Sequence, residues 1–450
     1  MNFTPCASNG RVFRLMKKGN NFCGSTEHDV SRRAFLGSMG AAGLMGTSGA
    51  VHALSEKGLT GALKSSKKRV ILLWLAGGSS QLETWDPKPG VVTGGPFTDI
   101  GTDIPGVRIS ELMPQMAKRM KHSCIVRSLN TRDGGHGGGA QMMMRGRKDE
   151  PNLKYPDLGA VVARELGQMD SQVPDYVNFY TSTEGRNSAR VSPGFLGARY
   201  GAIHLHDGEK LTLPNIKKLD SITQGDHEAR AQLRRFLSDR FEQGRELPVV
   251  KSHAAAYARV HGLMSSEKLF DLSSEPKKIR EMYGPTQFGE QVLMARRMVE
   301  AGVPFVRVSR AWWDSHGQNF ETHLELVPEL DRVLAALIDD LKQRGMFDDV
   351  LIVTMGEFGR TPRINGSLGR DHFATAWSAS LHGCGVKGGA VYGKTDAKGE
   401  KVTEGEIGAG EFFATILEAA GIDHTKEYHV GARPIPLVNP GIKPIKEVLA

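Results

Sequence analysis

Short runs of consecutive apolar residues recur along the chain and predict the strands of its core. Residues 69–76 read RVILLWLA, without the alternation of apolar and polar residues that a half-exposed strand shows. Such a run is typical of a strand that is buried on both faces. Similar runs predict further strands at residues 123–128, 176–180, 305–309, 350–355, 378–383 and 390–392.

Between these runs, apolar residues repeat at helical spacing. The clearest repeat covers residues 324–344, and another predicted helix covers residues 288–301, directly before a predicted strand. Strands that alternate with helices predict a parallel sheet with helices on both faces. In such a sheet the functional site lies beyond the carboxyl ends of the strands, so the loops that follow the apolar runs are where chemistry is expected.

Composition and charge exclude two classes of partner. The chain is 39% hydrophobic and 24% charged, which is ordinary for a globular protein. Of its net charge of +8, residues 1–53 carry +4 (six Lys and Arg, two Asp and Glu), which leaves +4 (8 − 4) for the remainder. No basic stripe interleaved with aromatic residues is present, so we expect no nucleic-acid partner. No apolar run after residue 53 approaches the roughly 18 residues of a membrane span, so none is expected in the mature form.

The N-terminal segment resembles a twin-arginine export signal. Arg32 and Arg33 precede a Gly- and Ala-rich stretch that ends at Ala53, where a signal peptidase could cut. The alternative, a chance arginine pair before a core helix, conflicts with the many Gly and Ser residues of this stretch. We therefore expect a signal peptide at residues 1–53, a linker at 54–68 and one domain at 69–450, with an insertion or cap at about 186–274. The export machinery is then a partner, and the mature protein is periplasmic or secreted.

Two cysteines remain after the predicted cleavage. Cys124 and Cys384 each lie in an apolar, strand-like stretch, which predicts buried free thiols. A disulfide between them after export stays open as the alternative.

Polar and ionisable side chains concentrate in four of the loops that follow predicted strands. One of these loops carries His136 inside a run of glycines, and another carries Asp314 and His316. A third contains Glu357 and continues to Asp371 and His372. Carboxylate and imidazole ligands together suit Zn²⁺ or Mn²⁺ better than Ca²⁺ or Mg²⁺. Because these loops should meet at one edge of the sheet, the sequence predicts a divalent metal site there.

The order of these motifs resembles the alkaline phosphatase/sulfatase superfamily. More closely, it is similar to an exported sulfatase-like family catalogued as domain of unknown function 1501. The resemblance rests on "GGSSQLETWDPKP", "HGGGAQMMMRGR", "WDSHGQNF", "GEFGRTPRIN" and "GRDHF", which lie between residue 69 and about residue 385. It implies an alkaline-phosphatase-like three-layer α/β fold with a mostly parallel central sheet and a helical insertion. It also implies metal-dependent hydrolysis of phosphate or sulfate esters, on a small molecule or a glycan.

Two departures from the superfamily pattern support a second hypothesis, a binding or scaffold protein that keeps the fold without turnover. The first strand of the superfamily ends in an acidic metal ligand, whereas this chain has Gly77 and Gly78 there, unless Glu83 or Asp86 folds back. Phe358 stands where the superfamily has an imidazole or amide side chain.

The resemblance suggests roles for His136 and Glu357, and the chemistry of the arginines and tryptophans near the predicted site suggests theirs. His136 occupies the nucleophile's position and acts either as a nucleophile or as a metal ligand; a histidine that merely caps a helix is the structural alternative. Glu357 is a general base or a ligand of a second metal. The arginines could bind the ester's oxygens or form structural ion pairs. Tryptophans 85, 312 and 313 could line a sugar subsite, with burial in the core as the equal alternative. The predicted metal ligands are Asp314, His316, Asp371 and His372, and the predicted substrate-binding residues are Arg132, Arg147, Arg360 and Arg370.

Overall fold

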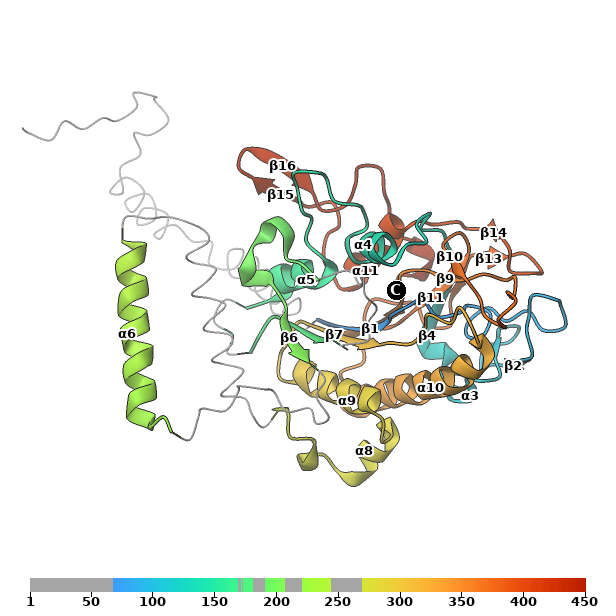
Figure 1. Ribbon diagram of the computed structural model, residues 1–450, viewed down its shortest axis with the longest axis horizontal. Coiled ribbons are helices and arrows are strands. Elements are labelled where there is room, and N and C mark those ends of the chain that lie inside the picture. Colours follow the sequence, from blue (N-terminus) through green and yellow to red (C-terminus); the bar gives the residue numbers. More distant parts are fainter. Residues whose placement is uncertain (1–67, 169–170, 172, 181–190, 207–220, 244–268) are drawn as a thin grey trace, which may run out of the picture. The chain divides into compact units, whose positions relative to one another are not determined.

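An eight-stranded sheet forms the centre of the fold in the computed structural model (Figure 1). The strand order is β12-β4-β11-β8-β1-β7-β5-β6, and β11 alone runs against the others, because it pairs antiparallel with both β4 and β8. The predicted strands are all present. The strands are β1 (Arg69–Leu75), β4 (Ser123–Leu129), β5 (Tyr176–Tyr180), β6 (Ile203–His206), β7 (Phe305–Arg310), β8 (Val350–Met355), β11 (Trp377–Gly383) and β12 (Val391–Tyr392).

The central strand β1 supplies side chains to two separate cores. Val70, Leu72 and Trp74 pack on one face of the sheet, and the residues between them pack on the other, all at 0–1% exposure. Each fully buried leucine or isoleucine of this kind contributes about 1.5–3 kcal/mol, which explains why the run lacks polar residues.

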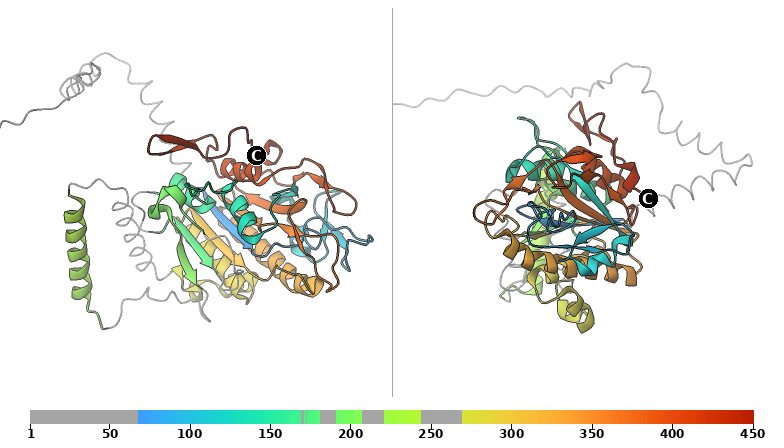
Figure 2. Two further views of the ribbon diagram at one scale, coloured as in Figure 1. Left: turned by 45° about the horizontal axis from the view of Figure 1, so that its top comes forward. Right: turned by 90° about the vertical axis from the view of Figure 1, so that its right-hand side faces the viewer.

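Helices cover both faces of the sheet (Figure 2). One face carries α4 (His136–Arg145), α5 (Leu158–Leu166) and α11 (Ala409–Ala419). The other carries α3 (Pro114–Ala117), α9 (Gln287–Glu300) and α10 (Asn319–Gln343). The predicted three-layer α/β fold with a mostly parallel sheet is therefore confirmed. The long helix begins five residues before its predicted start because a tertiary contact holds its first turn, where the buried Asn319 side chain donates to Glu83 at 3.1 Å.

The structure describes residues 68–450 except 169–170, 172, 181–190, 207–220 and 244–268, and all of these residues belong to one compact unit. The predicted signal peptide and all but the last residue of the linker lie outside this range. Among the described helices, none is long and apolar enough to cross a membrane.

Part of the segment predicted as a helical insertion belongs to the sheet. Residues 224–242 form a helix, α6 (Gln224–Glu242), as expected. Ile203–His206, in contrast, forms the edge strand β6, parallel to β5. Its buried Leu205 follows a half-exposed Ile203 and an exposed His204, which is a strand-like alternation within a segment that is polar overall.

Both cysteines in the described part of the chain are buried free thiols. Burial raises the pKa of Cys124 to about 12. The alternative of a disulfide between Cys124 and Cys384 is not formed.

Candidate metal centre

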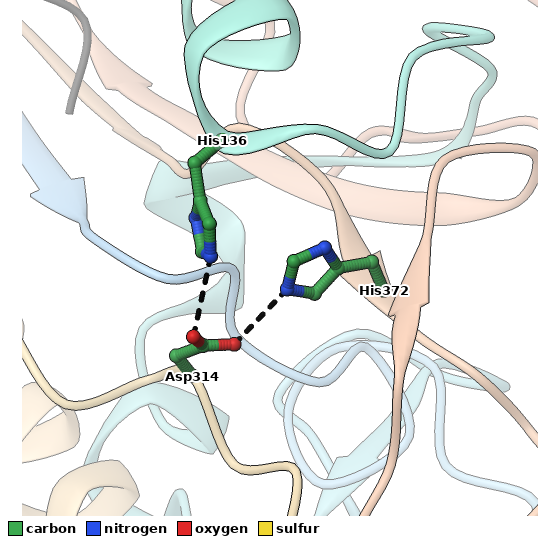
Figure 3. Close-up of side chains that lie close together, drawn as sticks. All are labelled: His136, Asp314 and His372. Carbon is green, nitrogen blue, oxygen red and sulfur yellow. Dashed lines mark hydrogen bonds and ion pairs between the residues drawn. The ribbon is translucent and has the colours of Figure 1, made fainter. Parts of the chain in front are cut away.

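Four side chains from distant parts of the sequence meet at one edge of the sheet. His136 is the first residue of α4, Asp314 and His316 follow β7, and His372 lies in the short strand β10 (His372–Phe373) just before β11. Because β11 runs against its neighbours, its beginning lies at the edge where β4 and β8 end. Figure 3 shows His136, Asp314 and His372 pointing toward one another.

The donor atoms of this cluster are at nearly equal distances. His136 Nε2 lies 3.2 Å from Asp314 Oδ2, and His372 Nε2 lies 3.1 Å from Asp314 Oδ1. His316 Nε2 lies 3.1 Å from Asp314 Oδ1 and 3.0 Å from His372 Nε2. One donor atom each of His136, Asp314 and His372 lies within 4.8 Å of the other two, so these three residues could hold one metal ion, and His316 lies beside them.

Each imidazole is held from behind through its other ring nitrogen. His136 Nδ1 lies 2.8 Å from Glu357 Oε1, and His316 Nδ1 lies 2.9 Å from Asp371 Oδ1. His372 Nδ1 lies 2.7 Å from the carbonyl oxygen of Gly134. Since a carbonyl oxygen only accepts, Nδ1 of His372 must carry the hydrogen, and the carboxylates favour the same arrangement in the other two rings. Imidazoles that bind metals in proteins are typically held in this way.

The chemistry of this donor set fits a divalent metal. With hydrogens on both Nδ1 atoms, the Nε2 lone pairs of His316 and His372 face each other at 3.0 Å, an arrangement that a cation would relieve. Tetrahedral bonds of about 2.0–2.1 Å place neighbouring donors about 3.3 Å apart, close to the 3.0–3.2 Å found here. Mixed nitrogen and oxygen donors suit zinc or manganese.

The electrostatic environment also favours a cation at this point. Hydrogen bonds with Asp314 and Glu357 outweigh burial and raise the pKa of His136 to about 9. Burial by itself would raise the pKa of Asp314, but hydrogen bonds from His136 and His372 and the charge of Arg360 lower it. A proton on His136 and a metal ion would therefore compete for the same nitrogen.

The two glycines after β1 allow close packing rather than metal binding. Gly77 has φ +107°, and a Cβ atom there would lie 2.4 Å from the backbone nitrogen of Asp314. Gly77 also donates its N–H to Glu357 Oε1 at 2.9 Å. Neither Glu83 nor Asp86 folds back to take its place, since the buried Glu83 pairs with Arg370 at 2.8 Å and Asp86 pairs with Lys88 at 2.9 Å.

The glycines around His136 have a similar packing role. A Cβ atom on Gly138 would lie 2.2 Å from Asp133 Oδ2, and one on Gly139 would lie 2.8 Å from the carbonyl oxygen of Glu357. The run of glycines thus brings the first turn of α4 against the loop after β8, which positions His136 beside Glu357.

The four predicted substrate-binding arginines differ in burial and in the groups that they contact. Arg360 is fully buried and donates to Asp314 Oδ1 at 2.6 Å and to the carbonyl oxygens of Gly77 and Gly78, so it fixes the carboxylate. The side chain of Arg132 is 81% exposed.

The other two arginines do not lie where a substrate was expected. Arg370 is fully buried and bonds Glu83 together with backbone carbonyls. Arg147, beyond the far end of α4, donates to the carbonyl oxygens of Pro436 and Leu437. Their guanidinium groups bond internal acceptors far away in the sequence, which favours a structural role for both over the predicted substrate binding.

Comparison with known proteins identifies a matching family and several similar solved structures. The family described as "Protein of unknown function (DUF1501)" matches residues 67–449. No curated protein sequence matches the chain. Among solved structures, the chain is similar to the PsFucS1 sulfatase from Pseudoalteromonas sp., with 13% identity, a TM-score of 0.38, and coverage of 82% of this chain and 71% of that chain. It is also similar to the phosphonate monoester hydrolase SpPMH from Silicibacter pomeroyi, at 11% identity and a TM-score of 0.34, covering 79% and 73%. A third is a magnesium-bound mutant of the TAB5 alkaline phosphatase, at 12% identity and a TM-score of 0.35, covering 79% of this chain and 98% of that chain.

Proposed function

The chain belongs to the DUF1501 family, and for this member we propose metal-dependent hydrolysis of phosphate or sulfate esters outside the cytoplasm. The observation that carries the proposal is the cluster of His136, Asp314, His316 and His372, whose donor atoms lie 3.0–3.2 Å from their neighbours at the functional edge of the sheet. His136, Asp314 and His372 would hold the metal, with His316 beside them. When bound, a divalent metal would polarise the ester as a Lewis acid.

The contacts of His136 favour the role of ligand over that of nucleophile. Its Nδ1 is held by Glu357, and its Nε2 faces Asp314 within the donor cluster. Glu357 lies behind the ring at 5% side-chain exposure, so we assign it the task of orienting His136 rather than that of a general base. Asp371 does the same for His316. These assignments replace the catalytic roles predicted for His136 and Glu357 and the ligand role predicted for Asp371.

The charged oxygens of the ester need a cationic or hydrogen-bonding partner near the metal. Arg132 has its side chain 81% exposed in the loop that leads into α4, and its guanidinium could bind such oxygens. The first turn of α4 also directs backbone N–H groups away from the helix, which favours an anion. Arg132 thus remains our candidate for substrate binding.

Location follows from the N-terminal segment, which lies outside the described residues. The pair Arg32 and Arg33 before a Gly- and Ala-rich stretch supports export by the twin-arginine route. We propose that residues 1–53 are removed and that the mature protein acts in the periplasm or outside the cell, on a small-molecule or glycan ester.

Elemental analysis and two chromogenic esters test the proposed activity. The purified chain should contain about one zinc or manganese ion and should hydrolyse 4-nitrophenyl phosphate or 4-nitrophenyl sulfate after metal supplementation. His372→Ala should lose both metal and activity. His429→Ala, an exposed histidine of the strand β15 (Glu427–Val430), is the matched control and should lose neither. A metal-free protein that stays inactive on both esters after supplementation would contradict the proposal.

One observation favours a second candidate, a metal-containing binding protein without turnover. Catalytic zinc sites generally keep a coordination position open for water or substrate, whereas four protein donors are typical of structural sites. Gly77 stands where an acidic ligand was expected, and His316, which lies beside the three candidate ligands, could close the remaining position. Stoichiometric metal without hydrolysis of either ester would support this candidate.

A further inference from the structure

A separate cavity of about 400 Å³ opens at the carboxyl end of β7, between the start of α9 and the second and third turns of α10. Its volume lies within the range of roughly 300–1,000 Å³ that is usual for small-molecule sites. Trp312 lines it and stands two positions before Asp314, a chain distance of no more than about 7 Å. The loop after β7 thus carries both the cavity-lining Trp312 and the candidate ligand Asp314.

Trp312 presents an aromatic surface at this cavity. Its side chain is 64% exposed, whereas the other four tryptophans of the chain are at most 1% exposed. Its backbone has φ +74°, a left-handed conformation that is rare for a residue with a side chain. A large aromatic residue held exposed in this way suits a flat ligand with apolar C–H groups on one face.

A buried amide in the wall of the cavity lacks a partner. Gln291 of α9 is 1% exposed, and its Nε2 finds no hydrogen-bond acceptor in the part of the chain that the structure describes. Buried amide donors are rarely left unpaired, because the loss of hydration is costly. A ligand hydroxyl oxygen would supply the missing acceptor.

The charges around the cavity disfavour a second anionic group. Arg310 is neutralised by Glu329 at 2.6 Å, and Glu325 adds a negative charge. A carboxylate repels phosphate or sulfate but accepts hydrogen bonds from hydroxyl groups. The cavity therefore matches a neutral ligand that is rich in hydroxyl groups.

We propose that this cavity binds a pyranose ring, which rests on the proposed function in that the ring would carry the ester hydrolysed at the metal centre. One face of the ring packs on Trp312, and a ring hydroxyl accepts from Gln291. The substrate class is then a sugar ester rather than a simple alkyl or aryl ester.

Quenching of tryptophan fluorescence by acrylamide tests binding directly, because Trp312 is the exposed tryptophan. Methyl glycosides of glucose, galactose, fucose and N-acetylglucosamine are the probes, and sorbitol at the same concentration controls for viscosity. At least one glycoside should lower the quenching constant at least twofold in the wild type, and this protection should weaken at least fivefold in Gln291→Leu. Leu324→Ala, which alters an exposed apolar residue outside the cavity lining, should bind like the wild type. Absence of protection by all four glycosides, or equal protection in Gln291→Leu, would overturn the proposal.

Two further measurements separate this inference from the proposed function. Protection by a glycoside should persist in His372→Ala, which lacks a metal ligand. If sugars protect Trp312 but no ester is hydrolysed, the cavity assignment holds and the hydrolase proposal fails. If 4-nitrophenyl esters are hydrolysed, the 6-sulfates or 6-phosphates of the same four sugars serve as a second set of substrates. Trp312→Ala should then raise KM for these sugar esters by a factor at least ten times larger than for the 4-nitrophenyl ester. An equal change in both would overturn the sugar site and leave the hydrolase proposal intact.

Discussion

The substitution Glu357→Gln isolates what a buried charge contributes to metal binding. Glu357 Oε1 contacts both His136 Nδ1 at 2.8 Å and the backbone N–H of Gly77 at 2.9 Å. A glutamine amide oxygen can accept both hydrogen bonds, so the substitution keeps these two contacts and removes the negative charge. Loss of such a supporting group typically weakens metal binding 10- to 100-fold, which corresponds to about 1.4–2.8 kcal/mol.

Asp371→Asn provides the internal comparison. Asp371 supports His316 at 2.9 Å as Glu357 supports His136, but its side chain is 44% exposed instead of 5%. Since water screens an exposed ion pair, this substitution should weaken binding by no more than about fivefold.

Competition with a chromophoric chelator gives the zinc dissociation constant of each metal-free variant at fixed pH. Thermal unfolding without metal checks that neither variant disturbs the fold; midpoints within about 2 °C of the wild type are expected. Zinc binding by Glu357→Gln within twofold of the wild type would refute the reasoning, as would a larger loss for Asp371→Asn than for Glu357→Gln.

Three other properties follow from the structure. The pKa of His136 is raised to about 9, so its proton must leave before zinc binds, and zinc affinity should rise about tenfold per pH unit between pH 7 and pH 9, then level off; titrations at three pH values measure this. The folding stability of the metal-free protein should change with pH in the opposite direction. The stabilisation from protonated His136 is fully present below the ordinary histidine pKa and is lost as the pH rises through about 9. Gly77→Ala brings a Cβ atom to 2.4 Å from the nitrogen of Asp314, and urea unfolding should show a loss of about 1–3 kcal/mol; an unchanged midpoint would contradict the packing argument. Burial and a pKa of about 12 should keep Cys124 unreactive toward a thiol reagent until the protein unfolds. If Cys124 of the folded protein were labelled as fast as an exposed cysteine, that result would count against the structure.

The sheet and its functional edge could be predicted from the sequence because their signals are local. Uninterrupted apolar runs identify strands buried on both faces, and the polar loops after them must lie at one edge when the strands are parallel. The proximity of His136, Asp314, His316 and His372 follows from that geometry, and their contacts agree with it.

The use of each remaining charged side chain could not be predicted, because it depends on partners far away in the sequence. Arg147 bonds a carbonyl oxygen 290 positions away, and Arg370 bonds a carboxylate 287 positions away. Nothing in their immediate sequence distinguishes them from Arg132, which stays exposed. The role of Glu357 was hidden for the same reason: its place after β8 put it at the site, but only the packing of α4 puts it behind His136.

The reversed direction of β11 has a consequence for how the protein would acquire a cation. Because β11 runs in the opposite direction, the last candidate donor, His372, precedes a strand instead of following one. The three candidate donors lie 178 and 58 positions apart in the chain. An unfolded polypeptide cannot hold these donors together, so an ion that binds them would be captured in the compartment where the sheet assembles, and it would then tie two long chain loops. An ion present at about 1,000 times its dissociation constant would add about 4 kcal/mol to the free energy of unfolding. If the chain crosses the membrane already folded, the cytoplasmic metal pool rather than the external one decides which ion it carries.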